Sequence, residues 1–192
     1  MNTVNWLVVA VALLLGVAWY LSYSAARLDR LHSRVEGALW ALDAQLVRRA
    51  EATLELANLG ILDPASALLL VGAASESLER TNERAGEDLL EGQHFAGREA
   101  VESELSEALQ VALTPEAVEA LRASDGVGES ALRGVEAAGI RVQLARRFHN
   151  DAVTDVRRVR RKPTVRLFRL AGHAELPQTV EFDDELPAAV RS

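Results

Sequence analysis

The first charged side chain in this sequence is Arg27. Before it, Val4 to Leu21 read VNWLVVAVALLLGVAWYL, which is apolar apart from Asn5. A run of this length lies within the range of about 17 to 25 residues that spans the hydrocarbon core of a bilayer. The complete absence of charge argues against a buried core helix of a soluble protein. We therefore expect residues 1–26 to form a transmembrane anchor.

The residues that flank the apolar run predict its orientation. Aromatic rings, which favour the headgroup level of a membrane, stand at both ends of the run: Trp6 on one side, and Trp19, Tyr20 and Tyr23 on the other. Basic residues follow on one side only, at Arg27, Arg30 and Arg34. Positive charge next to a transmembrane helix stays in the cytoplasm. We expect a single-pass protein of the cell membrane, with the N-terminus outside and the rest of the chain cytoplasmic.

A cleaved secretory signal is the alternative interpretation of the same segment. Ser24, Ala25 and Ala26 provide a small-x-small cleavage site. The segment lacks a positively charged start, however, and its apolar run is longer than that of an ordinary signal peptide. The anchor is the preferred interpretation.

Composition narrows the fold and excludes several functions. Only 5% of the residues are aromatic, and the chain is rich in Ala, Leu, Glu and Arg, which favours helices over strands. The net charge of -7 argues against a nucleic-acid partner. The chain contains no cysteine, which excludes disulfides, thiolate zinc sites, iron–sulfur clusters and cysteine nucleophiles.

Helical periodicity continues through the rest of the chain. Apolar residues at helical spacing, separated by capping and stop signals, predict helices over residues 28–58, 63–85, 98–113, 114–124 and 129–161, with a looser connection over 86–97. No stretch alternates with period two. The sequence predicts an all-α fold: an N-terminal transmembrane helix, an elongated antiparallel helical bundle over residues 27–170, and an extended, acidic, flexible tail over residues 171–192.

Two segments resemble a known family. ALWALDAQLVRRAEATLELA (Ala38 to Ala57) and RVQLARRFHNDAVTDVRRVRRKPTVRLFRL (Arg141 to Leu170), together with an N-terminal anchor and a late Phe182, are similar to the LemA family of bacterial membrane-anchored helical proteins. The family pattern has a Trp followed by D-x-Q-L-x-R-R, and later R-R-x-Y-N-x-x-V followed by Pro. The matching residues here are Trp40, Asp43, Gln45, Leu46, Arg48, Arg49, Arg146, Arg147, Asn150, Val153 and Pro163.

The resemblance covers the anchor and the first and last helices, and the middle is only loosely similar. The family's Tyr before Asn150 is His149 here, and its later Tyr-Asn pair is Val156 and Arg157. The resemblance implies a cytoplasm-facing, single-pass protein with a helical bundle. It implies no enzymatic activity, no cofactor and no catalytic residue.

Polar residues on the apolar helix faces form the first candidate site. At 100° per residue, Arg49 falls on the core face of the first long helix and Asp43 lies just beside it. Asp43 is about 24 Å beyond residue 27, and Arg146 about 22 Å before residue 161, at ~1.5 Å per residue. Antiparallel packing would place the two at one level, so we expect Asp43 to pair with Arg146 or Arg147, with Gln45 and Asn150 completing the hydrogen bonds. Such a layer fixes helix register or, alternatively, binds a ligand or partner.

A basic segment near the C-terminal end is the second candidate site. Its charged residues, interleaved with apolar ones, are Arg157, Arg158, Arg160, Arg161, Lys162, Arg166 and Arg169. The last helix of an up-and-down bundle returns towards the membrane, so this segment would face the inner leaflet, where anionic lipid attracts basic residues. A solvated helix end is the alternative.

The favoured function is a scaffold or interaction protein with no catalysis. Its partners would be the bilayer, anionic lipid headgroups and a membrane protein, with self-association through the apolar strip of Trp40, Ala44 and Val47. The alternative is a metal-dependent hydrolase of a phosphate compound that uses the acidic middle helices. The histidines, at positions 32, 94, 149 and 173, are scattered, so we expect no metal site.

Overall fold

The computed structural model describes residues 3–84, 95, 97–168 and 175–191. All regular secondary structure in these ranges is helical, so the predicted all-α class is confirmed. The helices are α1 (Thr3–Ala57), α2 (Pro64–Arg84), α3 (Arg98–Ala112), α4 (Pro115–Ala123), α5 (Val127–Arg160) and the short α6 (Pro163–Leu167). The connection expected over residues 86–97 lies outside the described residues, except for Phe95 and Gly97.

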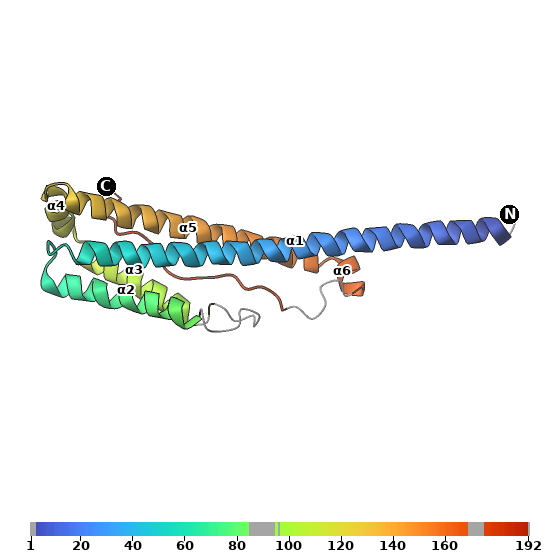
Figure 1. Cartoon of the computed structure of the whole chain (residues 1–192), viewed down its shortest axis with the longest axis horizontal. Coiled ribbons are helices and arrows are strands. Elements are labelled where there is room, and N and C mark those ends of the chain that lie inside the picture. Colours follow the sequence, from blue (N-terminus) through green and yellow to red (C-terminus); the bar gives the residue numbers. More distant parts are fainter. Residues whose placement is uncertain (1–2, 85–94, 96, 169–174, 192) are drawn as a thin grey trace.

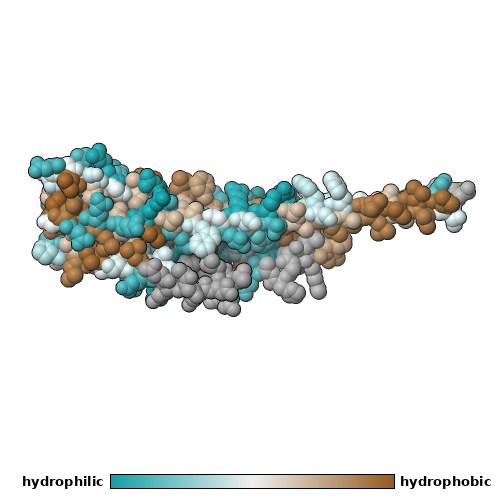
Figure 2. Space-filling view, in the orientation of Figure 1, coloured by the Kyte–Doolittle hydropathy of each residue, from teal (hydrophilic) through white to brown (hydrophobic). Residues whose placement is uncertain are grey.

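The first helix is continuous from the apolar run into the folded domain. α1 comprises 55 residues, because no proline interrupts it between Thr3 and Ala57. Its N-terminal part projects beyond the other helices (Figure 1) and forms a hydrophobic rod (Figure 2). None of its most apolar stretch is buried within the chain, and α1 is long and apolar enough to cross a membrane.

The predicted caps and stops set the helix boundaries. Asp63 accepts hydrogen bonds from the backbone amides of Ala65 and Ser66 at the start of α2, and Thr114 caps α4 in the same way. Gly126, with φ of 79°, adopts the left-handed conformation that glycine tolerates, and α5 therefore begins at Val127, two residues earlier than expected.

α1 and α5 lie side by side along the molecule (Figure 1) and share successive apolar clusters. Leu28 packs with Val159, Val35 with Val153 and Val156, and Leu42 and Leu46 with Val142. From one cluster to the next, the residue numbers therefore increase on α1 and decrease on α5. Apolar residues at helical spacing are buried on both helices, namely Leu28, Val35, Leu42 and Leu46 on α1 and Leu132, Val135, Gly139, Val142, Val153 and Val156 on α5.

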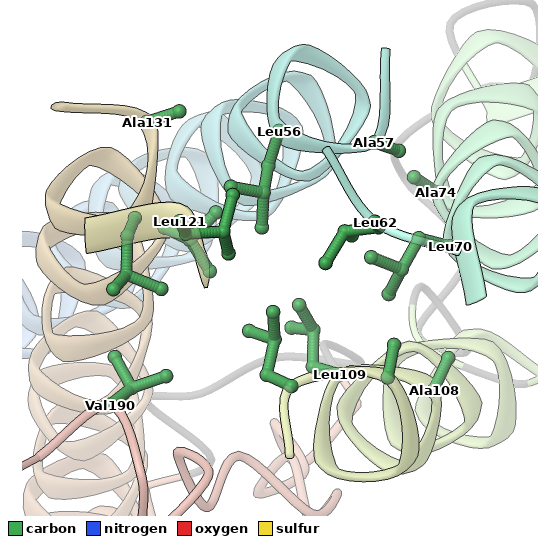
Figure 3. Close-up of a cluster of buried hydrophobic side chains, with 14 of the residues drawn as sticks. Leu56, Ala57, Leu62, Leu70, Ala74, Ala108, Leu109, Leu121, Ala131 and Val190 are labelled. Atoms are coloured by element: carbon green, nitrogen blue, oxygen red, sulfur yellow. The ribbon is translucent and has the colours of Figure 1, made fainter. Parts of the chain in front are cut away.

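The largest apolar cluster lies at the end of the domain opposite the projecting part of α1. Side chains from the C-terminal end of α1 and from α2, α3, α4 and α5 converge there (Figure 3). Leu56, Leu70 and Leu121 are fully buried in it. Val190, close to the C-terminus, joins the same cluster (Figure 3).

The C-terminal segment is packed, which corrects the expectation of a flexible tail. Residues 175–191, here called the tail, extend from near α6 along the bundle towards α4 (Figure 1), with a short turn at 188–190. The expectation rested on the acidic composition of the segment. Its apolar side chains nevertheless anchor it to the bundle, because four of them are buried, namely Val180, Phe182, Leu186 and Val190. Gly139 on α5 leaves room for Leu186, because a Cβ atom at residue 139 would collide with that side chain. Residues 171–174 of the predicted flexible tail lie outside the residues that the structure describes.

Candidate functional site

A buried ionic cluster connects α1, α2 and α3. Glu102 on α3 is fully buried, and its carboxylate accepts hydrogen bonds from Arg49 at 2.7 Å, from Arg98 at 3.1 Å and from Ser77 at 2.9 Å. Arg49 also donates to Ser106 at 3.0 Å. One carboxylate with two arginines leaves the group with positive charge, and Asp43 supplies the compensating anion at 2.8 Å from Arg98.

This cluster corrects the predicted ion pair. Among the described residues Asp43 pairs with Arg98 rather than with Arg146 or Arg147. Arg146 pairs instead with Asp184 of the tail, at 2.7 Å, and with Glu181, at 3.3 Å. Helix rise relates α1 only to α5, whereas α3 and the tail provide the charged groups that pair with Asp43 and Arg146.

Four of the six residues of the predicted polar layer are therefore divided between two places. Asp43 and Arg49 belong to the ionic cluster, whereas Arg146 and Asn150 bind the tail. Arg147 is exposed, and the buried side-chain oxygen of Gln45 accepts no hydrogen bond from the described residues. Sequence reasoning missed Arg98, Glu102 and Asp184, although the apolar neighbours Val101 and Leu105 at helical spacing place Arg98 and Glu102 close to the core face of α3.

The second place is the tail site, defined as the side chains of α1, α3 and α5 that contact the tail. Several of these side chains bind the tail's backbone. The Asn150 side chain donates to the carbonyl of Val180 at 3.0 Å and accepts from the amide of the same residue at 2.9 Å. Ser103 accepts from the amide of Asp183 at 3.0 Å, and Gln143 donates to the carbonyl of Asp184 at 2.7 Å. These bonds satisfy backbone groups that an extended segment outside a sheet would otherwise leave unpaired.

Phe182 occupies the centre of the tail site. Its ring is nearly buried, with the guanidinium carbons of Arg49 and Arg146 at 5.9 Å and 5.5 Å from the ring centre. Contacts of this kind between cations and aromatic faces are worth about 0.5–2 kcal/mol each. Asp184 raises the pKa of Arg146 through their hydrogen bond. The ring thus links the ionic cluster to the arginine that holds the tail's carboxylates.

His149 lies in the tail site with an unusual protonation behaviour. It is almost completely buried, and its Nε2 atom lies 3.3 Å from the carbonyl oxygen of Gln178. Burial lowers the pKa of His149, against the opposing influence of the Gln178 carbonyl and Asp43. The histidine is therefore held neutral at pH values at which an exposed histidine is partly protonated.

The lowered pKa of His149 predicts a loss of stability in weak acid. Because the unfolded histidine titrates near pH 6.5, the unfolded chain binds the extra proton first as the pH falls. The stabilising contribution is full above about pH 6.5 and declines as the pH falls towards the pKa of the folded state. We expect a His149→Gln variant to lack this part of the slope, as measured by urea unfolding of both chains between about pH 5 and pH 8. Identical slopes in the two chains would contradict the assignment.

Two hollows adjoin these sites. A polar hollow of about 260 Å³ lies between the tail and α5, lined by Gln143, Arg146, Arg147, Asn150, Asp151 and Asp184. An apolar hollow of about 210 Å³ lies between α1 and α5, lined by Ala38, Ala41, Gln45, Arg141, Leu144, Ala145 and Phe148. On the predicted self-association strip, Trp40 is 55% exposed, Ala44 is exposed and Val47 is half-buried.

The basic segment lies beside the first residues that follow the apolar run. Val159 and Val165 pack on Leu28, which places the end of α5 and all of α6 at that level. Arg157 and Arg160 bind the tail's backbone, at the carbonyls of Pro177 and Glu175. Four basic residues remain exposed, namely Arg158, Arg161, Lys162 and Arg166, and so do the apolar Leu167 and Phe168. Arg169 lies outside the described residues.

Metal-binding geometry is not found in the part of the chain that the structure describes. Within it, no three His, Cys, Asp or Glu side chains lie close enough together to hold an ion. His32 donates from its Nδ1 atom to the carbonyl of Leu28 within its own helix, whereas His94 and His173 lie outside the described residues. In the acidic middle helices, the Glu102 carboxylate is already bound by two arginines.

Comparisons of the chain with models of protein families, with curated proteins and with solved structures found no match.

Proposed function

We propose that this chain is a membrane-anchored scaffold of the LemA type, which presents helix faces to a membrane partner and catalyses no reaction of its own. In this proposal the apolar part of α1 spans the cell membrane once, with the N-terminus outside. The remaining helices form an elongated antiparallel bundle in the cytoplasm.

The continuity of α1 is the observation that carries the proposal. The same helix that exposes a surface from Val4 to Tyr20, apolar apart from Asn5, buries Leu28, Val35, Leu42 and Leu46 in the domain. Exposed apolar side chains in such number need a nonpolar surrounding, and a bilayer supplies it. The domain is therefore joined to the membrane by a rigid helix rather than by a flexible linker.

Contact with anionic lipid is the second part of the proposal. Val159 of α5 and Val165 of α6 pack against Leu28, which follows shortly after the apolar run. This packing keeps the exposed cations of α5 and α6 close to the end of the run. Each basic residue near an anionic surface contributes about 1 kcal/mol of attraction, which falls off within a Debye length. The exposed Leu167 and Phe168 add apolar side chains at the same level. This combination suits the boundary between headgroups and acyl chains.

Proximity labelling in intact cells tests the orientation and the scaffold role. A labelling enzyme on the C-terminus is paired with a topology reporter at the same end. We expect the reporter to signal the cytoplasm, because Arg27, Arg30 and Arg34 follow the apolar run. We expect the label to mark one or two recurrent membrane proteins. A reporter that signals the outside of the cell would overturn the orientation and the contact with the inner leaflet.

Reconstituted full-length chain tests the lipid contact. We expect the midpoint of thermal unfolding to be higher in vesicles that contain phosphatidylglycerol than in phosphatidylcholine alone. The increase should be lost when Arg158, Arg161, Lys162 and Arg166 are all changed to Gln, and it should shrink in high salt.

A matched variant separates lipid contact from overall charge. Changing Arg48, Arg122, Arg133 and Arg141 to Gln removes the same number of exposed cations from positions further along the domain. This variant should keep the difference between the two kinds of vesicle. An equal loss in both variants would show a general effect of charge and contradict a contact at the basic segment.

A further inference from the structure

We propose that the tail site is a docking site for an extended segment of a partner protein, and that the chain's own tail is an internal ligand that competes for it. The segment that fits has an apolar residue, an acidic residue and an aromatic residue in succession, followed directly by further acidic residues. The proposal deepens the scaffold function proposed above, because it states where and by what chemistry the partner binds.

The tail's backbone is held by side chains of the helices. The bonds to Val180, Asp183 and Asp184 come from side chains of α3 and α5 and not from a neighbouring strand. The paired bonds of Asn150 use both the amide and the carbonyl of one residue, which requires an extended backbone. Such bonds do not depend on the bound side chains, so another segment in the same conformation can make them.

The same site is also selective for particular side chains. The Phe182 ring lies next to two guanidinium groups, and Val180 packs in the same cluster with Leu42, Leu46 and Val142. Arg146 holds Asp184 with two bonds, at 2.7 Å and 3.0 Å, and reaches Glu181 at 3.3 Å. A site with this charge selects carboxylates on either side of an aromatic ring.

The chain's own tail competes with any partner segment for the tail site. A tethered segment acts at an effective concentration on the order of millimolar, so a partner segment meets a site that is occupied most of the time. The tail also joins the main core at Val190, which adds to its advantage. A partner displaces the tail only when its own segment is held close to the site, or when that segment binds more tightly than the tail does.

Severing the tail in the full-length chain tests the proposal. Residues 169–174 are replaced by the recognition sequence of a site-specific protease, and the protein is purified in detergent. A fluorescent peptide with the sequence of residues 175–191 is then added before and after cleavage. We expect little binding to the uncut chain and saturable binding to the cut chain, followed by fluorescence anisotropy. A peptide with Phe182→Ala should compete about tenfold more weakly or worse, because it loses both the ring burial and the guanidinium contacts.

Matched variants on both partners control for indirect effects. Leu176 is largely exposed, so a peptide with Leu176→Ala should compete as the parent does. On the domain, Asn150→Ala should weaken binding of the peptide about tenfold, whereas Arg133→Ala, on an exposed position of the same helix, should not change it. A peptide with the same composition in scrambled order should not compete.

Three outcomes would overturn the proposal. The first is a cut chain that stays helical by circular dichroism yet takes up no peptide. The second is a cut chain that loses its helical signal when the severed tail is washed away, which would make the tail a part of the core rather than a ligand. The third is an uncut chain that forms dimers in sedimentation that the peptide dissociates, which would assign the site to the tail of a second copy. All three measurements use purified protein, so they are independent of the orientation that the cell experiment tests.

Discussion

A Glu102→Ala variant is expected to lose about 3–5 kcal/mol of unfolding free energy, the cost typical of removing one partner from a buried ion pair. Glu102 forms ion pairs with Arg49 and Arg98, and all three side chains are at most 3% exposed. Without the carboxylate, two buried guanidinium groups would share the partly exposed Asp43 as their anion. Urea unfolding of the full-length chain in detergent, followed by helical circular dichroism, measures the loss.

Glu107 provides the control for this variant. It lies on the same helix, is exposed, and has the same side chain. Glu107→Ala should change the unfolding free energy by no more than about 0.5 kcal/mol, as exposed substitutions usually do. Comparable losses in the two variants would mean that the ionic cluster is not a stabilising element of the fold.

A Leu46→Ala variant is expected to lose about 2–5 kcal/mol, because it leaves a cavity where three elements meet. Leu46 is fully buried among Val142 of α5 and Val180 and Phe182 of the tail. The cavity should also loosen the tail, so hydrogen exchange of the amides of Val180 and Asp183 should accelerate. Mass spectrometry of peptides from residues 175–191 measures that exchange directly.

Leu68→Ala is the matched change at an exposed position, where the leucine is 73% accessible. It removes the same atoms without creating a cavity, and we expect neither a large loss of stability nor faster exchange in the tail. If Leu46→Ala left the tail's exchange rates unchanged, the tail would not depend on the α1–α5 core beneath it.

Local signals predicted the helices well because their physical causes are local. Asp63 and Thr114 cap helices through hydrogen bonds to amides two or three residues away. The apolar spacing on α1 and α5 likewise depends only on helix geometry, so the buried faces of both followed from the sequence. Arg49 was placed on a core face for the same reason, and it is buried.

Partners distant in the sequence were the part that could not be predicted. Asp43 has its arginine on α3, which is 55 residues away, and Arg146 has its carboxylate in the tail, 38 residues away. The choice among several arginines depends on how α2 and α3 pack beside α1, and periodicity carries no information about that. The tail itself was misjudged because its acidic composition outweighed Phe182 and Leu186, which are both buried.

The unbroken α1 has a mechanical consequence if its apolar part spans the bilayer. From Leu21 to Ala57 the helix extends about 54 Å at ~1.5 Å per residue, with no hinge along that length. Transmembrane helices adjust their tilt when bilayer thickness changes. A change in tilt of about 10° would carry the distal end, with α2, α3 and α4, sideways by roughly 9 Å, as follows from that length. The thickness of the surrounding membrane would thus determine where the far end of the domain meets its neighbours.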